Sequence, residues 1–151
     1  MTARRRASTA AVAVLALAAL SACEKPAPIV TVVNAGRSVY SEASIYCFDG
    51  QSSAQGNCAT RASGLTSIAV QGGQPVGIDV AKPLVGRGWV IELSDPSNKS
   101  AQPQQSEVQH KHYYSFTAPT LPQGSAVLLT VRALGSGNRP SGEWRFTLTP
   151  R

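Results

Sequence analysis

Two histidines are the side chains in this sequence best suited to metal chemistry. His110 and His112 are the only histidines, and one residue separates them at the start of an expected strand. In a strand this spacing points both imidazoles to one face, as in half of a metal site, and Glu107 is close in sequence. No third or fourth ligand follows at a recognisable spacing. We therefore favour a solvated strand end over a metal site.

Residues for nucleophilic or acid–base catalysis are present, but they do not form known catalytic motifs. The sequence contains no Gly-x-Ser-x-Gly motif, and Ser136 lies between two glycines in a segment typical of a turn. The acidic residues are dispersed over inferred outward faces and loops, so no glycosidase pair is indicated. They include Glu42, Asp49, Asp79, Glu92, Asp95, Glu107 and Glu143. We expect neither enzymatic activity nor a cofactor.

The amino-terminal segment predicts export. Residues 4–6 are arginines, and residues 10–20 form an apolar stretch that is too short for a comfortable bilayer span. The stretch ends in Leu20-Ser21-Ala22-Cys23, which resembles the lipobox of bacterial lipoproteins. The resemblance implies that residues 1–22 are a cleaved signal peptide and that Cys23 carries diacylglycerol and an acyl chain such as palmitate. The alternative is an ordinary secretory signal with cleavage elsewhere.

Two further cysteines, Cys47 and Cys58, remain once Cys23 is assigned to lipid. Disulfides persist outside the cytoplasm, so we expect these two cysteines to pair. A redox or metal-binding pair is the alternative. However, ten intervening residues are far from the Cys-x-x-Cys spacing that tunes thiol reactivity.

The charge of the chain gives no indication of nucleic-acid binding. The full sequence has 14 Lys and Arg against eight Asp and Glu, a net charge of +6. Removal of residues 1–22 takes away three arginines and no acid, which lowers the net charge to +3. The remaining basic residues are scattered, without the clustered patch of a nucleic-acid-binding protein. We expect no nucleic-acid partner.

After the signal peptide the sequence predicts one β-rich domain. Residues 23–28 contain two prolines and predict a short tether, and residues 29–151 are enough for a single domain. Period-two alternation bounded by Gly, Pro, Asn and Ser indicates strands, with Trp89 and Trp144 in the core. The expected strands are 29–33, 39–48, 75–80, 88–94, 112–118, 126–133 and 143–149, with a weaker candidate at 68–70. The polar segment 94–109 is expected to be a surface excursion.

About seven short strands favour an all-β fold, a single immunoglobulin-like β-sandwich; a closed barrel is the alternative. Residues 121–133, Leu-Pro-Gln-Gly-Ser-Ala followed by Val-Leu-Leu-Thr-Val-Arg-Ala, resemble the turn and following strand of fibronectin type III and other immunoglobulin-like domains. The aromatic that such domains place early in this strand is replaced by Val127.

The whole mature chain resembles small actinobacterial lipoproteins that carry a domain of unknown function. The matching features are the lipobox, Tyr46-Cys47 with a second cysteine soon after, Pro75-Val76-Gly77-Ile78-Asp79-Val80, Gly88-Trp89-Val90-Ile91, and the strand of Trp144. This resemblance implies attachment to the extracytoplasmic face of the cell membrane. It implies no particular activity.

We therefore expect a lipid-anchored, non-catalytic interaction module whose partner is an envelope protein or glycan. The competing hypothesis is a small-ligand carrier or an enzyme whose site forms only in three dimensions; a deep pocket lined by Asp, Glu or His would favour it. In an immunoglobulin-like sandwich the first strand starts at the same pole as the loops that here span 49–65 and 134–142. The short tether would keep this pole near the membrane, with Lys25, Arg61 and Arg139 facing anionic headgroups.

Overall fold

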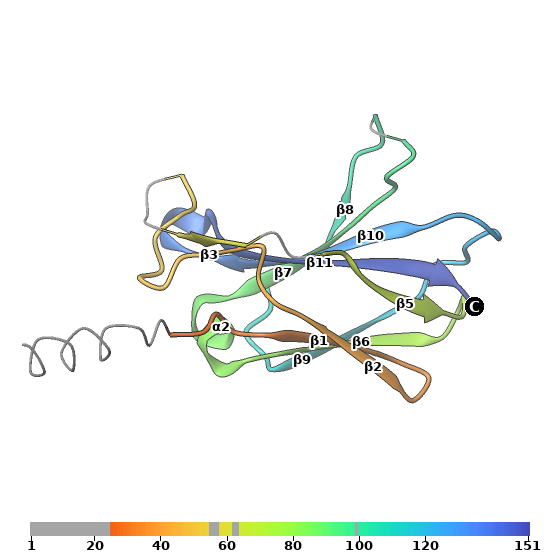
Figure 1. Ribbon diagram of the computed structural model, residues 1–151, viewed down its shortest axis with the longest axis horizontal. Helices are drawn as coiled ribbons and strands as arrows, with labels where there is room; N and C mark the ends of the chain where they lie inside the picture. The colour runs from red at the N-terminus through yellow and green to blue at the C-terminus, as the bar shows by residue number, and fades with distance from the viewer. Residues whose placement is uncertain (1–24, 55–57, 62–63, 99) are drawn as a thin grey trace, which may run out of the picture.

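The computed structural model describes residues 25–54, 58–61, 64–98 and 100–151. Within these residues the chain forms eleven strands, one short α-helix and one 3₁₀ turn. The strands form two sheets that lie face to face as the layers of a sandwich (Figure 1). The predicted all-β sandwich is confirmed.

The smaller sheet contains four antiparallel strands. Their order is β2 (Arg37–Ser41), β1 (Val30–Asn34), β6 (Pro75–Val80) and β9 (Tyr113–Thr117). Strands β1 and β2 are joined by Ala35 and Gly36, whose φ angles of 47° and 76° are both positive, as a type I′ hairpin turn requires. The segment Asn34-Ala35-Gly36 is therefore part of a hairpin turn. Residues 30, 32 and 34 of β1 face the core, because every second side chain points to the same face.

The larger sheet contains seven strands. Its order is β4 (Ala59–Thr60), β3 (Ile45–Tyr46), β11 (Pro140–Pro150), β10 (Val127–Leu134), β7 (Trp89–Ser94) and β8 (Gln104–Gln105), with β5 (Thr66–Val70) also on β11. Strand β3 pairs antiparallel with the start of β11, and β5 pairs parallel with its end. Strand β11 thus connects the two ends of the sandwich.

The structure corrects the prediction of one strand over residues 39–48. The segment is divided into β2 in the smaller sheet and β3 in the larger sheet. The chain changes sheets at residues 42–44, where both the backbone N–H and the hydroxyl of Ser44 donate to the carbonyl of Glu143. The sequence does not reveal such a change, because the apolar run at residues 45–48 fits a buried strand in either sheet.

Two further elements differ from the expected list. The weaker candidate at 68–70 belongs to a full strand, β5, which accounts for part of the excess over seven strands. A six-residue helix, α2 (Lys82–Arg87), follows β6; Pro83 lies in its first turn and Gly88, with φ of 87°, caps its end. A helix this short has no periodicity that a sequence window detects. No helix in the described part of the chain is long and apolar enough to cross a membrane.

The core lies between the two sheets and contains both tryptophans. Trp89 on β7 and Trp144 on β11 are fully buried, which confirms their prediction as core residues. The Trp89 indole N–H donates to the carbonyl of Lys111 at 2.9 Å, and that of Trp144 donates to the carbonyl of Pro28 at 2.8 Å. Each large ring is thus buried with its polar atom satisfied.

Candidate functional site

The pole of the sandwich where the described chain begins is the best candidate for a functional site. Residues 25–29, helix α2, strand β3 and the start of β11 gather at this end of the molecule (Figure 1). The carbonyl of Gly50 accepts the backbone N–H of Ser136 at 3.1 Å, so the loops within 49–65 and 134–142 meet. The bond from Trp144 to Pro28 brings the first strand's start to the same place. The predicted grouping at one pole is confirmed.

Arg87, at the last turn of α2, is held by two backbone carbonyls. Its Nη1 donates to the carbonyl of Cys47 at 3.1 Å, and its Nη2 donates to that of Phe48 at 2.9 Å. The guanidinium carbon lies 5.9 Å from the centre of the Tyr46 ring. Gly50, with φ of 75°, passes so close that a Cβ there would lie 3.1 Å from the guanidinium carbon. Residues 47–50 thus surround the guanidinium of Arg87 on one side.

Beside Arg87 lies a cleft of about 470 Å³, within the range of small-molecule sites. One wall of the cleft is formed by the chain before β1, and a second by α2 with Ala81. The aromatic side chains of Tyr46 and Phe48 form the third wall. The lining residues are Lys25, Pro26, Ala27, Pro28, Ile29, Tyr46, Phe48, Ala81, Pro83 and Arg87. The lining therefore contains two cations and otherwise mainly apolar groups. From the sequence, Gly86-Arg87-Gly88 reads as a turn between strands in preference to a phosphate cradle, so Arg87 itself was not identified as a site residue.

The predicted disulfide is present at this pole. Cys47 and Cys58 are bonded, with Cα atoms 4.2 Å apart, and Cys47 is fully buried. The bridge closes the loop that supplies both carbonyl acceptors of Arg87. Its position indicates a structural role in holding the arginine. The predicted lipidation site, Cys23, and the predicted signal peptide, residues 1–22, lie outside the described residues.

The two histidines lie near α2, and Nδ1 of each ring forms a hydrogen bond with a backbone carbonyl. Nδ1 of His110 is 3.2 Å from the carbonyl oxygen of Val85, and Nδ1 of His112 is 3.1 Å from that of Val80. Within the described residues no three His, Cys, Asp or Glu side chains are grouped as a metal site would need. Glu107 is not brought into such a group.

We expect the double substitution His110→Ala with His112→Ala to leave zinc and copper affinity unchanged. The reason is that the two imidazoles bond to separate carbonyls and gain no third ligand from the described chain. Competition titration with a chromophoric chelator measures the affinity. Loss of a submicromolar site in the variant would contradict this interpretation.

Three of the seven acidic side chains that the sequence left dispersed, Glu42, Glu92 and Glu143, are engaged with arginines. Glu143 accepts from Arg132 and Arg145, and Glu92 accepts from Arg132. On the exposed surface Glu42 pairs with Arg61 at 3.1 Å, so this predicted headgroup-facing cation has a partner. Glu92 and Glu143 therefore share Arg132 as a partner, whereas the carboxylates of a glycosidase pair must be available to the substrate.

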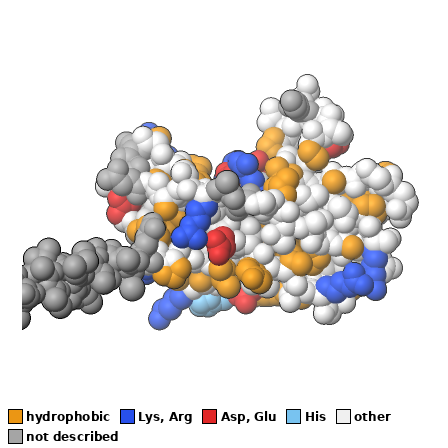
Figure 2. All heavy atoms as spheres, in the orientation of Figure 1, with side chains coloured by type: hydrophobic (Ala, Val, Ile, Leu, Met, Phe, Trp, Pro, Cys, Tyr) orange, Lys and Arg blue, Asp and Glu red, His pale blue; other side chains and the backbone are white. Residues whose placement is uncertain are grey.

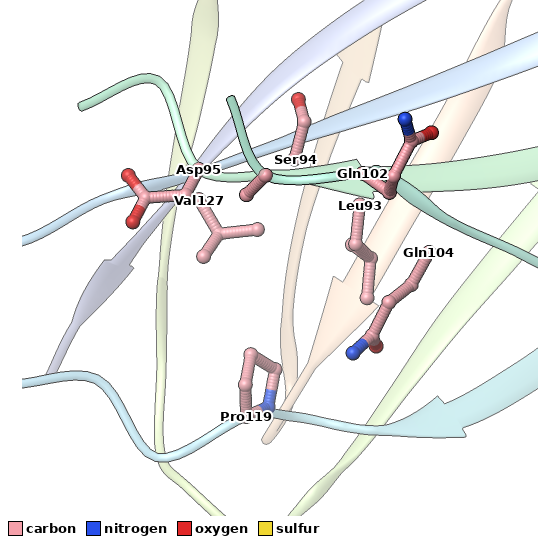
Figure 3. A pocket seen from close by; sticks show the side chains of 8 residues that line it. Leu93, Ser94, Asp95, Gln102, Gln104, Pro119 and Val127 are labelled. Carbon is pink, nitrogen blue, oxygen red and sulfur yellow. The ribbon is translucent and has the colours of Figure 1, made fainter. Parts of the chain in front are cut away.

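Two smaller clefts lie beside strands β7 and β8, at the edge of the larger sheet. Figure 3 shows one of them, with Leu93 and Val127 from the larger sheet opposite Pro119; the side chain of Gln104 extends toward Pro119, and the amide of Gln102 points away. Its volume is about 220 Å³, and a neighbouring cleft that includes Tyr114 and Phe116 measures about 230 Å³. Both are below the usual size of small-molecule sites.

Residues 94–98 and 100–109 belong to the projecting arm above these clefts, which stands out from the molecular surface (Figure 1 and Figure 2). Its two-residue strand β8 pairs with β7, so the predicted surface excursion contains a short element. At its base the Ser97 hydroxyl and backbone N–H donate to the carboxylate of Asp95 and lower the pKa of that group from its usual value. Asp95 is therefore ionised at neutral pH, and the arm carries a fixed negative charge there.

Comparisons with known proteins add no family to this description. No protein-family model matches the chain, and no curated protein is similar to it. The fold and the site geometry therefore carry the functional argument. They define a disulfide-bonded, two-sheet β-sandwich with a cationic, largely apolar cleft at the pole where the described chain begins.

Proposed function

We propose that this protein is a lipoprotein anchored by lipid on Cys23 to the outer face of the cytoplasmic membrane. The lipobox-like Leu20-Ser21-Ala22-Cys23 and the preceding basic and apolar segments support this proposal. So does the resemblance of the mature sequence to small actinobacterial lipoproteins with an immunoglobulin-like or fibronectin-III-like domain. The envelope would be that of an actinobacterium or another Gram-positive bacterium.

The lipobox-like tetrapeptide carries the proposal, and the contact between the tether and the sandwich indicates which pole would face the bilayer. The Trp144 indole donates to the Pro28 carbonyl, so the chain leaves the sandwich at a defined pole. From Pro28 to Cys23 an extended chain reaches only about 20 Å. A lipid on Cys23 would hold this pole next to the bilayer and present the opposite pole, with the β1–β2 turn, to the exterior.

The domain would act as a non-catalytic interaction module. Two of the clefts beside the arm are smaller than usual small-molecule sites, and the carboxylates of Glu92 and Glu143 are held by arginines, which favours surface recognition over chemistry. Its partner would be an envelope protein or a glycan that approaches the distal pole or the arm. With a net charge of only +3 after signal removal, a nucleic-acid partner is not part of the proposal.

Replacing Cys23 by alanine is expected to block both lipidation and cleavage, because the lipoprotein signal peptidase acts on the lipidated cysteine. The variant should accumulate as the full precursor, and the wild type should do the same when the peptidase is inhibited. Metabolic labelling with an alkyne fatty acid and mass spectrometry of the amino-terminal peptide measure both steps. A matched control, Cys58→Ser, should still be labelled and cleaved. Release of a soluble variant with the wild-type mature terminus would contradict the proposal.

A further inference from the structure

The cleft at the N-terminal pole combines positive charge with apolar walls. Its lining contains Lys25 and Arg87 and no carboxylate. No carboxylate of the described residues lies within ion-pair distance of either cation. The walls also contain Ile29, whose side chain is 49% exposed. A ligand that fits this lining carries negative charge on one part and hydrocarbon on another.

Arg87 is already oriented for an anion. Two of its five N–H hydrogens are used on the carbonyls of Cys47 and Phe48, and none of the other three bonds to a described residue. Because the loop that supplies those carbonyls is closed by the disulfide, the guanidinium needs little reorganisation to bind. A planar guanidinium also matches the oxygens of a phosphate group.

The position of the cleft identifies the source of such an anion. Lys25 lines the cleft and is two residues from Cys23, so an extended chain separates them by about 7 Å. On the proposed function, a lipid on Cys23 therefore places the cleft in the headgroup layer. Bacterial lipid headgroups offer phosphates there, beside glycerol and the first methylenes of the acyl chains.

We propose that this cleft binds an anionic phospholipid of the bilayer. The phosphate lies between Arg87 and Lys25, and the glycerol and upper acyl chain contact Ile29, Pro26 and Phe48. The diacylglycerol on Cys23 is a less suitable occupant, because it is neutral and would leave both cations without a counter-charge. Access to the bilayer depends on the proposed function, whereas the complementarity of charge and shape depends only on the cleft.

Photocrosslinking from within the cleft tests the proposal. The full chain carries p-benzoylphenylalanine in place of Ile29 and is reconstituted in nanodiscs with equal amounts of phosphatidylglycerol and phosphatidylcholine. Mass spectrometry then gives the ratio of the two lipid adducts. One cation near the membrane surface favours binding of an anionic lipid over a zwitterionic lipid by about fivefold. We expect phosphatidylglycerol adducts to exceed phosphatidylcholine adducts at least fivefold, and each of Lys25→Gln and Arg87→Gln to lower the ratio several-fold.

Matched controls separate the cleft from general surface charge. The same probe at Ser136, an exposed residue of the same pole outside the cleft, should give a lower ratio that neither glutamine variant changes. Arg139→Gln should leave the ratio from position 29 unchanged. Since Lys25 makes no hydrogen bond or ion pair within the described chain, Lys25→Gln keeps the test decisive even if Arg87→Gln does not fold.

The outcomes are distinct. Equal adducts of both lipids at position 29, no lipid adduct there, or an adduct only with the acyl chains on Cys23 would each overturn the proposal. The mass of the amino-terminal peptide from the same sample reports lipidation separately. An unmodified Cys23 with a preserved, variant-sensitive lipid ratio would refute the anchor while supporting the cleft.

Discussion

Replacing Trp144 by alanine is expected to lower the free energy of unfolding by about 3–5 kcal/mol. The indole is fully buried in the core, and its ring centre lies 5.9 Å from that of Tyr46. Removing it leaves a large cavity at the pole and an unpaired carbonyl at Pro28. Urea denaturation followed by circular dichroism measures the change.

The variant Trp144→Phe separates the ring from its hydrogen bond. Phenylalanine keeps most of the apolar volume but cannot donate to Pro28, so we expect a loss of about 1–2 kcal/mol. Hydrogen exchange at Ile29 and Val30 should rise more than exchange in β10. Equal losses for the alanine and phenylalanine variants would mean that the hydrogen bond, and not packing, dominates at this position.

Removing the disulfide by Cys58→Ser is expected to cost about 3 kcal/mol in the chain-entropy model. The bridge joins residues separated by 11 positions, and its loss frees the loop in the unfolded chain. Cys58 is the better site for substitution, because a serine at the fully buried Cys47 would also bury a new hydroxyl. Unfolding of the variant and of the reduced wild type should shift by similar amounts.

The loss of the bridge should also loosen the loop that accepts the hydrogen bonds of Arg87. Its two carbonyl acceptors, Cys47 and Phe48, begin the loop that the bridge closes. We therefore expect faster amide exchange at Gly50, whose backbone N–H donates to Cys47, and little change in β7. Unchanged stability after complete reduction would show that packing alone holds this loop.

Together these variants test whether the stability of this pole and the shape of its cleft depend on the same contacts. Trp144 fixes the tether from one side, and the bridged loop fixes Arg87 from the other. Both walls of the cleft therefore depend on contacts between residues far apart in sequence. A change in the core at this pole should alter lipid binding as well as stability, whereas a change at the distal β1–β2 turn should leave lipid binding unaltered.

Local patterns in the sequence were sufficient to predict most of the strands and the sandwich. The alternation of Trp144, Phe146 and Leu148 predicts one buried face, and all three are fully buried in β11. The Cys47–Cys58 pair followed from the number of cysteines left after Cys23. These predictions succeed because alternation and cysteine number depend on the residues themselves and not on which strands become neighbours.

Sheet membership and the cleft were decided only by the tertiary structure. Residues 39–48 contain no signal for the change of sheet, since the apolar run at 45–48 fits a buried strand in either layer. Arg87 meets carbonyls about 40 residues earlier in the chain, and Trp144 meets Pro28 across 116 residues. Such contacts leave no spacing signal. They arise when packing of the two sheets brings α2, β3 and the start of β11 to one pole, and this packing makes the cationic cleft.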